Sequence, residues 1–205
     1  MINQERIIEV ASQLFVQHGV KSVTIDRIVG ELHTSKRTLY NHFSDKTELL
    51  RACLSVYHKK IKAENEAAIE TADNAIEAMA GIHQQIVRRA SVVNPNFFND
   101  ILHYYPGLLH ESYRANGNFA HAQVVRLGEW GIRDGIFMKD LDMEIVVKMV
   151  LLLLDLLKDN NRFPITKYSK ERLTFAILVP YMRGLCTDKG RQLLEMQEEL
   201  FRVTL

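Results

Sequence analysis

Residues that break helices are scarce in this sequence. Its 205 residues include only 4 prolines and 10 glycines, and runs of alternating β-branched residues are few. Proline and glycine destabilise helix interiors, and strands favour β-branched residues, so this composition favours an all-helical fold. Hydrophobic residues make up 47% of the chain and charged residues 25%, which allows a sizeable core and argues against a disordered chain.

Cysteine and long apolar runs are also rare. The two cysteines, Cys53 and Cys186, lie far apart in apolar surroundings, which favours reduced, buried thiols over a disulfide. The most apolar run, residues 145–157, is too short to span a membrane and carries Lys148 and Asp155. The first ten residues are charged and contain no uninterrupted apolar segment, so we expect no signal peptide. We expect a cytoplasmic protein that has no membrane partner.

The motifs of enzymes and metalloproteins are missing too. We find no Gly-rich phosphate loop, Ser/His/Asp arrangement or paired-carboxylate motif, so we expect neither an enzyme nor a cofactor. Among the eight histidines, His103, His110 and His121 are the ones that invite a metal hypothesis. Their separations do not match the tight spacing that metal ligands usually show, and no cysteine joins them. We therefore expect no metal site.

Positive charge is concentrated in the amino-terminal part of the chain. The net charge is +1, yet residues 1–62 contain ten Lys/Arg and only six Asp/Glu, and the remainder is mildly acidic. A basic end joined to a near-neutral body fits a head that binds nucleic acid, although the excess alone is weak evidence.

Apolar spacing predicts three short helices followed by a longer one. The first covers residues 4–18, the second 25–32, the third follows Ser35, and the fourth runs from about 46 to 65. Further helices are expected near residues 73–91, 95–104, 106–116, 118–133, 143–158, 169–187 and 189–202.

The second and third helices, with the tight turn between them, form a helix-turn-helix arrangement. In such a pair, the later helix, which is the third of this chain, enters the major groove of DNA, and the earlier helix crosses the phosphate backbone. Leu39 and Phe43 would anchor the third helix to the core while its polar face contacts DNA. The expected DNA-binding residues are Thr24, Ser35, Lys36, Arg37, Thr38, Tyr40, Asn41, His42 and Lys46.

These residues divide by expected role. Lys36, Arg37 and Asn41 are expected to probe base edges in the groove, because their side chains match the hydrogen-bonding groups there. The phosphate-contacting group is Tyr40, His42 and Lys46, with Thr24 at the start of the second helix. Lys46 lies at a helix start, where the helix dipole disfavours a cation, and this suggests an external anion.

The segment "VTIDRIVGELHTSKRTLYNHFSDKTELL" resembles the DNA-binding motif of the TetR family of bacterial transcriptional repressors. The resemblance covers about residues 4–50, a quarter of the chain. The matching positions are Thr24, Ile28, Ser35, Lys36, Thr38, Leu39, Tyr40, His42, Phe43, Lys46 and Leu49. Four residues depart from the pattern: His33 replaces the turn glycine, Arg37 replaces a small residue, and Val29 and Leu32 stand where alanine is common. Histidine adopts a left-handed backbone more readily than most residues, so we expect the turn to persist.

The resemblance implies two domains, a helix-turn-helix head at residues 1–45 and a larger helical body at 46–205 that dimerises and binds an effector. Helices near 143–158 and 169–187 are apolar around most of their circumference, and relatives pack two such helices from each subunit into a four-helix bundle. We expect Pro180 to kink the second of these helices.

Aromatic residues of the body form either a packed core or the lining of an effector cavity. Residue by residue, the packed core is the better interpretation, but the resemblance implies a cavity. The candidate lining residues are Met79, His83, Phe97, Phe98, Tyr104, Tyr105, Phe119 and Trp130.

The expected function is a ligand-responsive transcriptional regulator. As a homodimer it would bind a pseudo-palindromic operator on double-stranded DNA, repress transcription, and be released by a small-molecule effector of unknown identity. One alternative is a DNA-binding protein without an effector, and another is a small-molecule binding module whose head is vestigial.

Overall fold

The computed structural model describes residues 2–157, 162–164 and 166–201, and these residues are almost entirely helical. The predicted all-α fold is confirmed: the described residues contain no β-strand, only one isolated antiparallel bridge between Phe137 and Cys186. Along the same residues, each helix is too short or too polar to cross a lipid bilayer. In chain order the helices are α1 (Gln4–His18), α2 (Ile25–Glu31), α3 (Lys36–Tyr40), α4 (Lys46–Glu70), α5 (Ala75–Val92), α6 (Asn96–Tyr104), α7 (Pro106–Arg133), α8 (Met143–Leu156), α9 (Lys170–Leu173), the π-helix η1 (Thr174–Leu178), α10 (Val179–Leu185), α11 (Asp188–Met196) and α12 (Glu198–Phe201).

The chain forms two compact units. The first, which we call the head unit, comprises Met1–Lys62 and Val92–Asn116, and the second, the body unit, comprises Ala63–Ser91 and Gly117–Leu205. Helices α4 and α7 each contribute residues to both units. The predicted boundary after residue 45 separates a DNA-binding domain from an effector-binding and dimerisation domain. Compact units do not test that division, so it stays a prediction.

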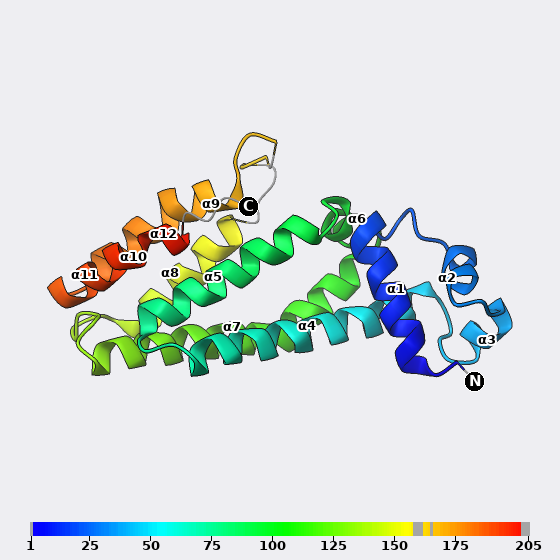
Figure 1. The fold of residues 1–205 in the computed structure, drawn as a ribbon, viewed down its shortest axis with the longest axis horizontal. Coiled ribbons are helices and arrows are strands. Elements are labelled where there is room, and N and C mark those ends of the chain that lie inside the picture. Colours follow the sequence, from blue (N-terminus) through cyan, green and yellow to red (C-terminus); the bar gives the residue numbers. More distant parts are fainter. Residues whose placement is uncertain (1, 158–161, 165, 202–205) are drawn as a thin grey trace. The chain divides into compact units, whose positions relative to one another are not determined.

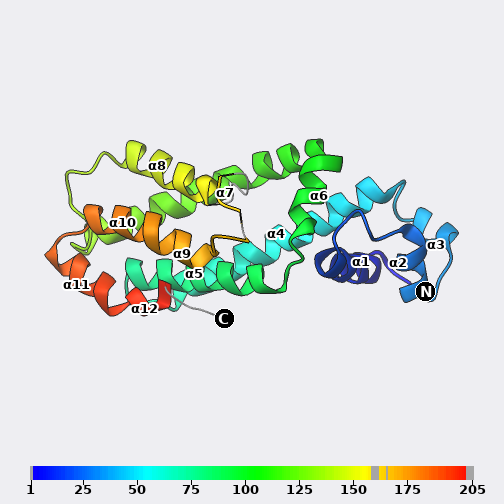
Figure 2. The ribbon, with the colours of Figure 1, turned by 90° about the horizontal axis from the view of Figure 1, so that it is seen from above.

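The head unit has its own apolar core. Helices α1, α2 and α3 lie close together (Figures 1 and 2), and each places apolar side chains in the same buried cluster. The members of this cluster with no exposed surface are Ile7, Ala11, Phe15, Val20, Val23, Ile28, Leu39, Leu49, Leu50 and Ile101. Because Ile101 belongs to α6, the head core includes a helix that lies far from the helix-turn-helix in sequence.

Each of the first three helices begins at a capping side chain. Asn3, Thr24 and Ser35 have extended backbones and accept hydrogen bonds from the backbone N–H groups three residues later. Such caps satisfy N–H groups that have no partner within the helix, and each is worth about 1 kcal/mol. At the start of α4, Asp45 accepts from the Glu48 N–H and Glu48 reaches back to accept from the Ser44 N–H, in the manner of a capping box. Local sequence therefore fixes where these helices start.

His33 occupies the turn between α2 and α3 with a left-handed backbone, at φ 49°. It is the only residue other than glycine with positive φ in the described part of the chain. Its N–H donates to the Gly30 carbonyl at 3.1 Å, and the Thr34 N–H donates to the Val29 carbonyl at 2.9 Å. The expectation that the turn forms without glycine is confirmed, and these two bonds help to hold His33 in a disfavoured conformation.

Two later predictions differ from the structure. Residues 106–133 form one helix, α7, so the break predicted between 116 and 118 is wrong. A single glycine inside a helix costs only about 1 kcal/mol, which is too little to end a helix supported by packing. The helix predicted at 169–187 is interrupted before Pro180 by the π-helical segment Thr174–Leu178, in which the Val179 N–H donates to the Thr174 carbonyl. The expected kink at Pro180 stays a prediction.

The body unit buries its apolar residues around α5, α10 and α11. This core includes Ile76, Ile136, Val179 and Leu194, none of which is more than slightly exposed. Both cysteines of the chain are buried and unpaired, as predicted, and burial raises the pKa of each thiol to about 11.

Candidate nucleic-acid interface

Helix α3 has one buried anchor and a polar exposed face. Leu39 has no exposed surface and Phe43, just after the helix, is also buried, whereas Lys36, Arg37 and Tyr40 are exposed. The helix starts at Ser35, whose Oγ accepts from the Thr38 N–H at 3.1 Å. A short helix fixed by one apolar side chain and exposing cationic and aromatic groups has the form required to enter a major groove.

Arg37 is the basic residue of α3 that is free to contact a ligand. Its guanidinium forms no ion pair or hydrogen bond with any residue that the structure describes. Asn41 follows the helix as its C-cap and is also exposed. Arg37 and Asn41, four residues apart, are thus both exposed, and their contact with base edges stays a prediction.

Lys36 already has an acidic partner. Its Nζ lies 2.7 Å from Asp26 Oδ1, so this ion pair joins the start of α3 to the first turn of α2. The hydrogen bond and the charge of Asp26 raise the pKa of Lys36, so the ammonium remains protonated at neutral pH. Sequence analysis missed Asp26, because the pair joins residues ten apart across a turn.

Lys46 points into the head instead of toward solvent. Its Nζ donates to the Val20 carbonyl at 2.6 Å and lies 5.7 Å from the centre of the Phe15 ring. Burial lowers the pKa of Lys46, an effect that the charge of Asp100 partly offsets. An intramolecular partner thus accounts for a cation at this helix start, and the phosphate contact of Lys46 stays a prediction.

The remaining predicted DNA-binding residues lie on or beside the same helices. Thr24 is exposed and caps α2 by accepting from the Arg27 N–H at 3.2 Å. Thr38 is partly buried, and its hydroxyl lies 3.0 Å from that of Ser35. His42 is also partly buried, just beyond α3. Thr24 and Ser35 are therefore both exposed N-caps, whereas Thr38 lies partly buried inside α3, and their DNA contacts stay predictions.

Helix α6 and the segment before it are hydrogen-bonded to α1 and the loop that follows α1, within the head unit. Asp100 accepts from the Lys21 N–H at 2.7 Å, and Asn94 donates from its backbone to Val16 and from its side chain to Gln17. A Cβ at Gly19, which has φ 81°, would lie 3.0 Å from Asp100 Oδ2, so only glycine fits there without a shift. Sequence reasoning missed these contacts, which span more than seventy residues of chain.

The eight candidate lining residues are divided between the two units. Phe97, Phe98, Tyr104 and Tyr105 belong to the head unit, whereas Met79, His83, Phe119 and Trp130 belong to the body unit. Phe97 is buried in the head core, and the ring centres of Phe97 and Phe98 are 4.9 Å apart. In the body unit, His83 is buried with its ring 5.5 Å from that of Phe201. A shared lining formed by all eight residues stays a prediction.

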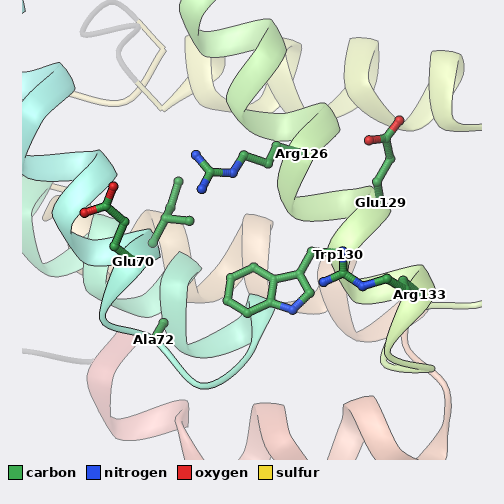
Figure 3. A pocket seen from close by; sticks show the side chains of 7 residues that line it. Glu70, Ala72, Arg126, Glu129, Trp130 and Arg133 are labelled. Carbon is green, nitrogen blue, oxygen red and sulfur yellow. The ribbon is translucent and has the colours of Figure 1, made fainter.

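The body unit has a hollow of about 420 Å³ between α4 and α7 (Figure 3). Of the predicted lining residues, only Trp130 borders it, and the Trp130 indole N–H donates to Asp134 at 2.7 Å. Both arginines of its rim have carboxylate partners, since Arg126 lies 2.6 Å from Glu66 and Arg133 lies 3.2 Å from Asp134. The lining residues are Ile69, Glu70, Ala72, Arg126, Glu129, Trp130 and Arg133.

A buried amide pair also joins α4 to α7 in the body unit. Asn65 Nδ2 donates to Gln123 Oε1 at 3.1 Å. The other amide atoms, Asn65 Oδ1 and Gln123 Nε2, are buried and have no partner in the described part of the chain. Buried polar atoms are nearly always hydrogen-bonded in proteins, so a donor and an acceptor here require a water or a ligand.

Comparison with known proteins identifies the head. Residues 7–53 match the family model described as "Bacterial regulatory proteins, tetR family". An HTH-type transcriptional regulator of Staphylococcus aureus strain USA300 is 45% identical over 47 residues. This match covers 23% of the present chain and 25% of that regulator, so the similarity in sequence is confined to about a quarter of each protein.

Solved structures share the fold along nearly the whole chain. A TetR-family transcriptional regulator from Marinobacter aquaeolei VT8 matches with a TM-score of 0.70 at 18% identity, covering 98% of this chain and 99% of its own. A gamma-butyrolactone receptor (ArpA-like protein) matches with a TM-score of 0.62 at 15% identity, covering 97% and 96%. Residues 7–53 therefore match the tetR family of bacterial regulatory proteins, and nearly the whole chain shares its fold with solved structures that include a TetR-family regulator.

Proposed function

We propose that this protein is a DNA-binding transcriptional regulator that uses α3 as its recognition helix. The observation that carries the proposal is the form of α3, with Leu39 fully buried beneath exposed Arg37 and Tyr40. A guanidinium can donate two hydrogen bonds to a guanine edge, and a tyrosine hydroxyl can donate to a phosphate. The protein would act in the cytoplasm, where its DNA lies.

We infer that the regulator binds DNA as a homodimer. Helix α8 has one buried residue, Val147, while Ile145, Met149 and Leu152 are exposed at positions four and three residues apart. This spacing places the three side chains along one helix face. Pairing of such faces in two copies, together with the helix at 169–187, would present two recognition helices to a pseudo-palindromic operator with half-sites one DNA turn apart.

A small-molecule effector would bind in the body unit and release the operator. Two observations support this: the hollow beside Trp130, and the unsatisfied amide atoms of Asn65 and Gln123. Helices α4 and α7 each contribute residues to both units, so they could carry a change in the body to the head, where α6 is bonded to the loop after α1 and could pass it on. The effector would favour a head arrangement that no longer matches the operator, and its differential affinity would set the strength of release.

An effector-independent DNA-binding protein is the second candidate. The observation that favours it is that only Trp130 of the eight predicted lining residues borders the hollow of the body unit. A thermal-shift screen of metabolites against the dimer distinguishes the candidates, because a ligand that binds the folded state raises the melting temperature. Release of the operator by the same ligand supports the first candidate.

The test of DNA binding is a salt titration with a duplex from the promoter region of the protein's own gene. Contacts to phosphates release counterions, so the logarithm of the binding constant should fall linearly and steeply with the logarithm of salt concentration. Arg133→Ala in the body unit is the matched control for Arg37→Ala in α3, since each removes one exposed guanidinium. A flat salt response, or equal losses from both substitutions, would count against the proposal.

A further inference from the structure

We propose that Asp26 is a specificity-determining residue that restrains Lys36 in the unbound head. Its carboxylate lowers affinity for DNA of unrelated sequence and thereby increases the preference for the operator. This inference rests on the proposed function, because it concerns how the same surface distinguishes one DNA sequence from another.

The contact itself is the first step of the argument. Lys36 Nζ and Asp26 Oδ1 are 2.7 Å apart, and the two side chains remain 54% and 71% exposed. An ion pair at this exposure is weak, because water and salt screen it and both side chains lose freedom in forming it. It therefore contributes little to folding and can open when a stronger partner approaches Lys36.

The second step concerns the charges available on α2 and α3. Across residues 24–42 the basic residues are Arg27, Lys36 and Arg37, and the acidic residues are Asp26 and Glu31. Of the three cations, Lys36 is the one with an ion pair among the described residues. In the unbound head, the ion pair with Asp26 thus occupies one of the three cations of this segment that can contact phosphate.

The consequence differs between the two kinds of DNA. Binding to unrelated sequence depends almost entirely on the number of phosphates that cations neutralise. Opening the Lys36–Asp26 pair there yields one phosphate contact and leaves the Asp26 carboxylate beside the DNA without a partner. On the operator, base contacts from α3 add to the interaction and offset this cost. Asp26 therefore weakens unrelated binding more than operator binding.

Asp26→Asn is the substitution that tests this role, since it removes the charge and keeps the shape. The probes are the duplex that the parent protein selects from a random library and a scrambled duplex of the same length. For the scrambled duplex, one added phosphate contact makes the slope of log binding constant against log salt concentration steeper by about 0.9. The ratio of variant to parent affinity should therefore change about 3.5-fold between 50 and 200 mM salt. The ratio of operator to scrambled affinity should fall.

Two further variants separate the mechanism from a general effect of charge. Glu31→Gln is the matched control, because Glu31 is an exposed acid on the same helix and makes no ion pair with the described residues. It should leave the salt slope and the specificity ratio close to those of the parent. In a Lys36→Gln background the effect of Asp26→Asn should disappear, since the restrained cation is already absent. Circular dichroism checks that each variant is folded.

Three results would overturn the proposal. If Asp26→Asn leaves the salt dependence of binding to the scrambled duplex unchanged, Asp26 does not restrain Lys36. If the effect of Asp26→Asn persists in the Lys36→Gln background, it arises from direct repulsion between Asp26 and the DNA. Equal effects of Asp26→Asn and Glu31→Gln show that net charge alone is responsible. A parent protein that binds neither duplex contradicts the proposed function itself, and this inference falls with it.

Discussion

Helix α3 of the head unit and helix α8 of the body unit treat their apolar residues differently. In the head, the helix-turn-helix buries Leu39 completely and leaves only polar and aromatic groups of α3 in solvent. In the body, α8 leaves Ile145 and Leu152 more than half exposed, at 58% and 63%. The core beneath α3 is therefore complete within one chain, whereas α8 has an apolar face exposed to solvent. Exposed apolar faces of this kind mark protein–protein contacts, which is why we propose that α8 pairs in a dimer while α3 contacts DNA.

The largest expected effect breaks the head core and spares the body. Leu39→Ala removes buried methyl groups and should cost about 2–5 kcal/mol of head stability. Leu152→Ala changes an exposed leucine and should alter the folding of a single chain by about 0.5 kcal/mol at most. Hydrogen exchange followed by mass spectrometry separates the two, with faster exchange in α1–α3 for the first variant only. Equal loss of protection in both units would contradict the separate cores.

The second effect breaks the proposed dimer. Leu152→Glu places a charge on the exposed face of α8 and should weaken association by about 3 kcal/mol, roughly a hundredfold, because the charge would be buried without a partner. Light scattering over a concentration series measures the change in mass. Leu102→Glu, at a leucine of α6 that is 60% exposed and lies outside the proposed interface, is the matched control. A monomeric parent protein would contradict the dimer.

The third effect concerns the exposed face of α3. Arg37→Ala should cost about 1–3 kcal/mol on the preferred operator and change the sequence preference, because a base contact is lost. Tyr40→Phe removes a phosphate donor and should weaken binding to all sequences alike. Selection from a random library by each variant measures the difference. If both variants prefer the parent's sequence, the assignment of Arg37 to base recognition is wrong.

The smallest effect concerns the contact between α6 and the amino-terminal loop. Asp100→Ala removes the acceptor of the Lys21 N–H and should destabilise the head by about 1 kcal/mol, a typical net value for one hydrogen bond. If α6 transmits an effector signal, the same variant should also reduce effector release of the operator. Asp140→Ala, in the loop before α8, is a matched control that should change neither. Unfolding in urea gives the first quantity and operator binding with effector gives the second.

Local signals in the sequence predicted most of the head correctly. Thr24, Ser35 and Asp45 mark helix starts, and each does so through hydrogen bonds within three residues, so a window of sequence contains all the necessary information. His33 could be predicted as a left-handed turn residue for the same reason. These features depend on nearest neighbours in the chain.

Features that depend on distant residues could not be predicted in the same way. The bond from Lys21 to Asp100 joins residues 79 apart, and the turn of Lys46 toward Val20 depends on how α4 packs in the head. Two helices were predicted between residues 106 and 133, where the structure has the single helix α7. The lining residues are the clearest case, because aromatic residues form cores and cavities alike, and only the fold decides between them.

The most direct test of the central claim is a hydrogen-exchange comparison of the protein with and without its selected operator duplex. If α3 is the recognition helix, the duplex should slow exchange of backbone amides across residues 33–46 and at the start of α2, since contact excludes water and restricts opening. The π-helical segment Thr174–Leu178 serves as an internal reference that should not change. Protection confined to the body unit, or no protection at saturating DNA, would contradict the account.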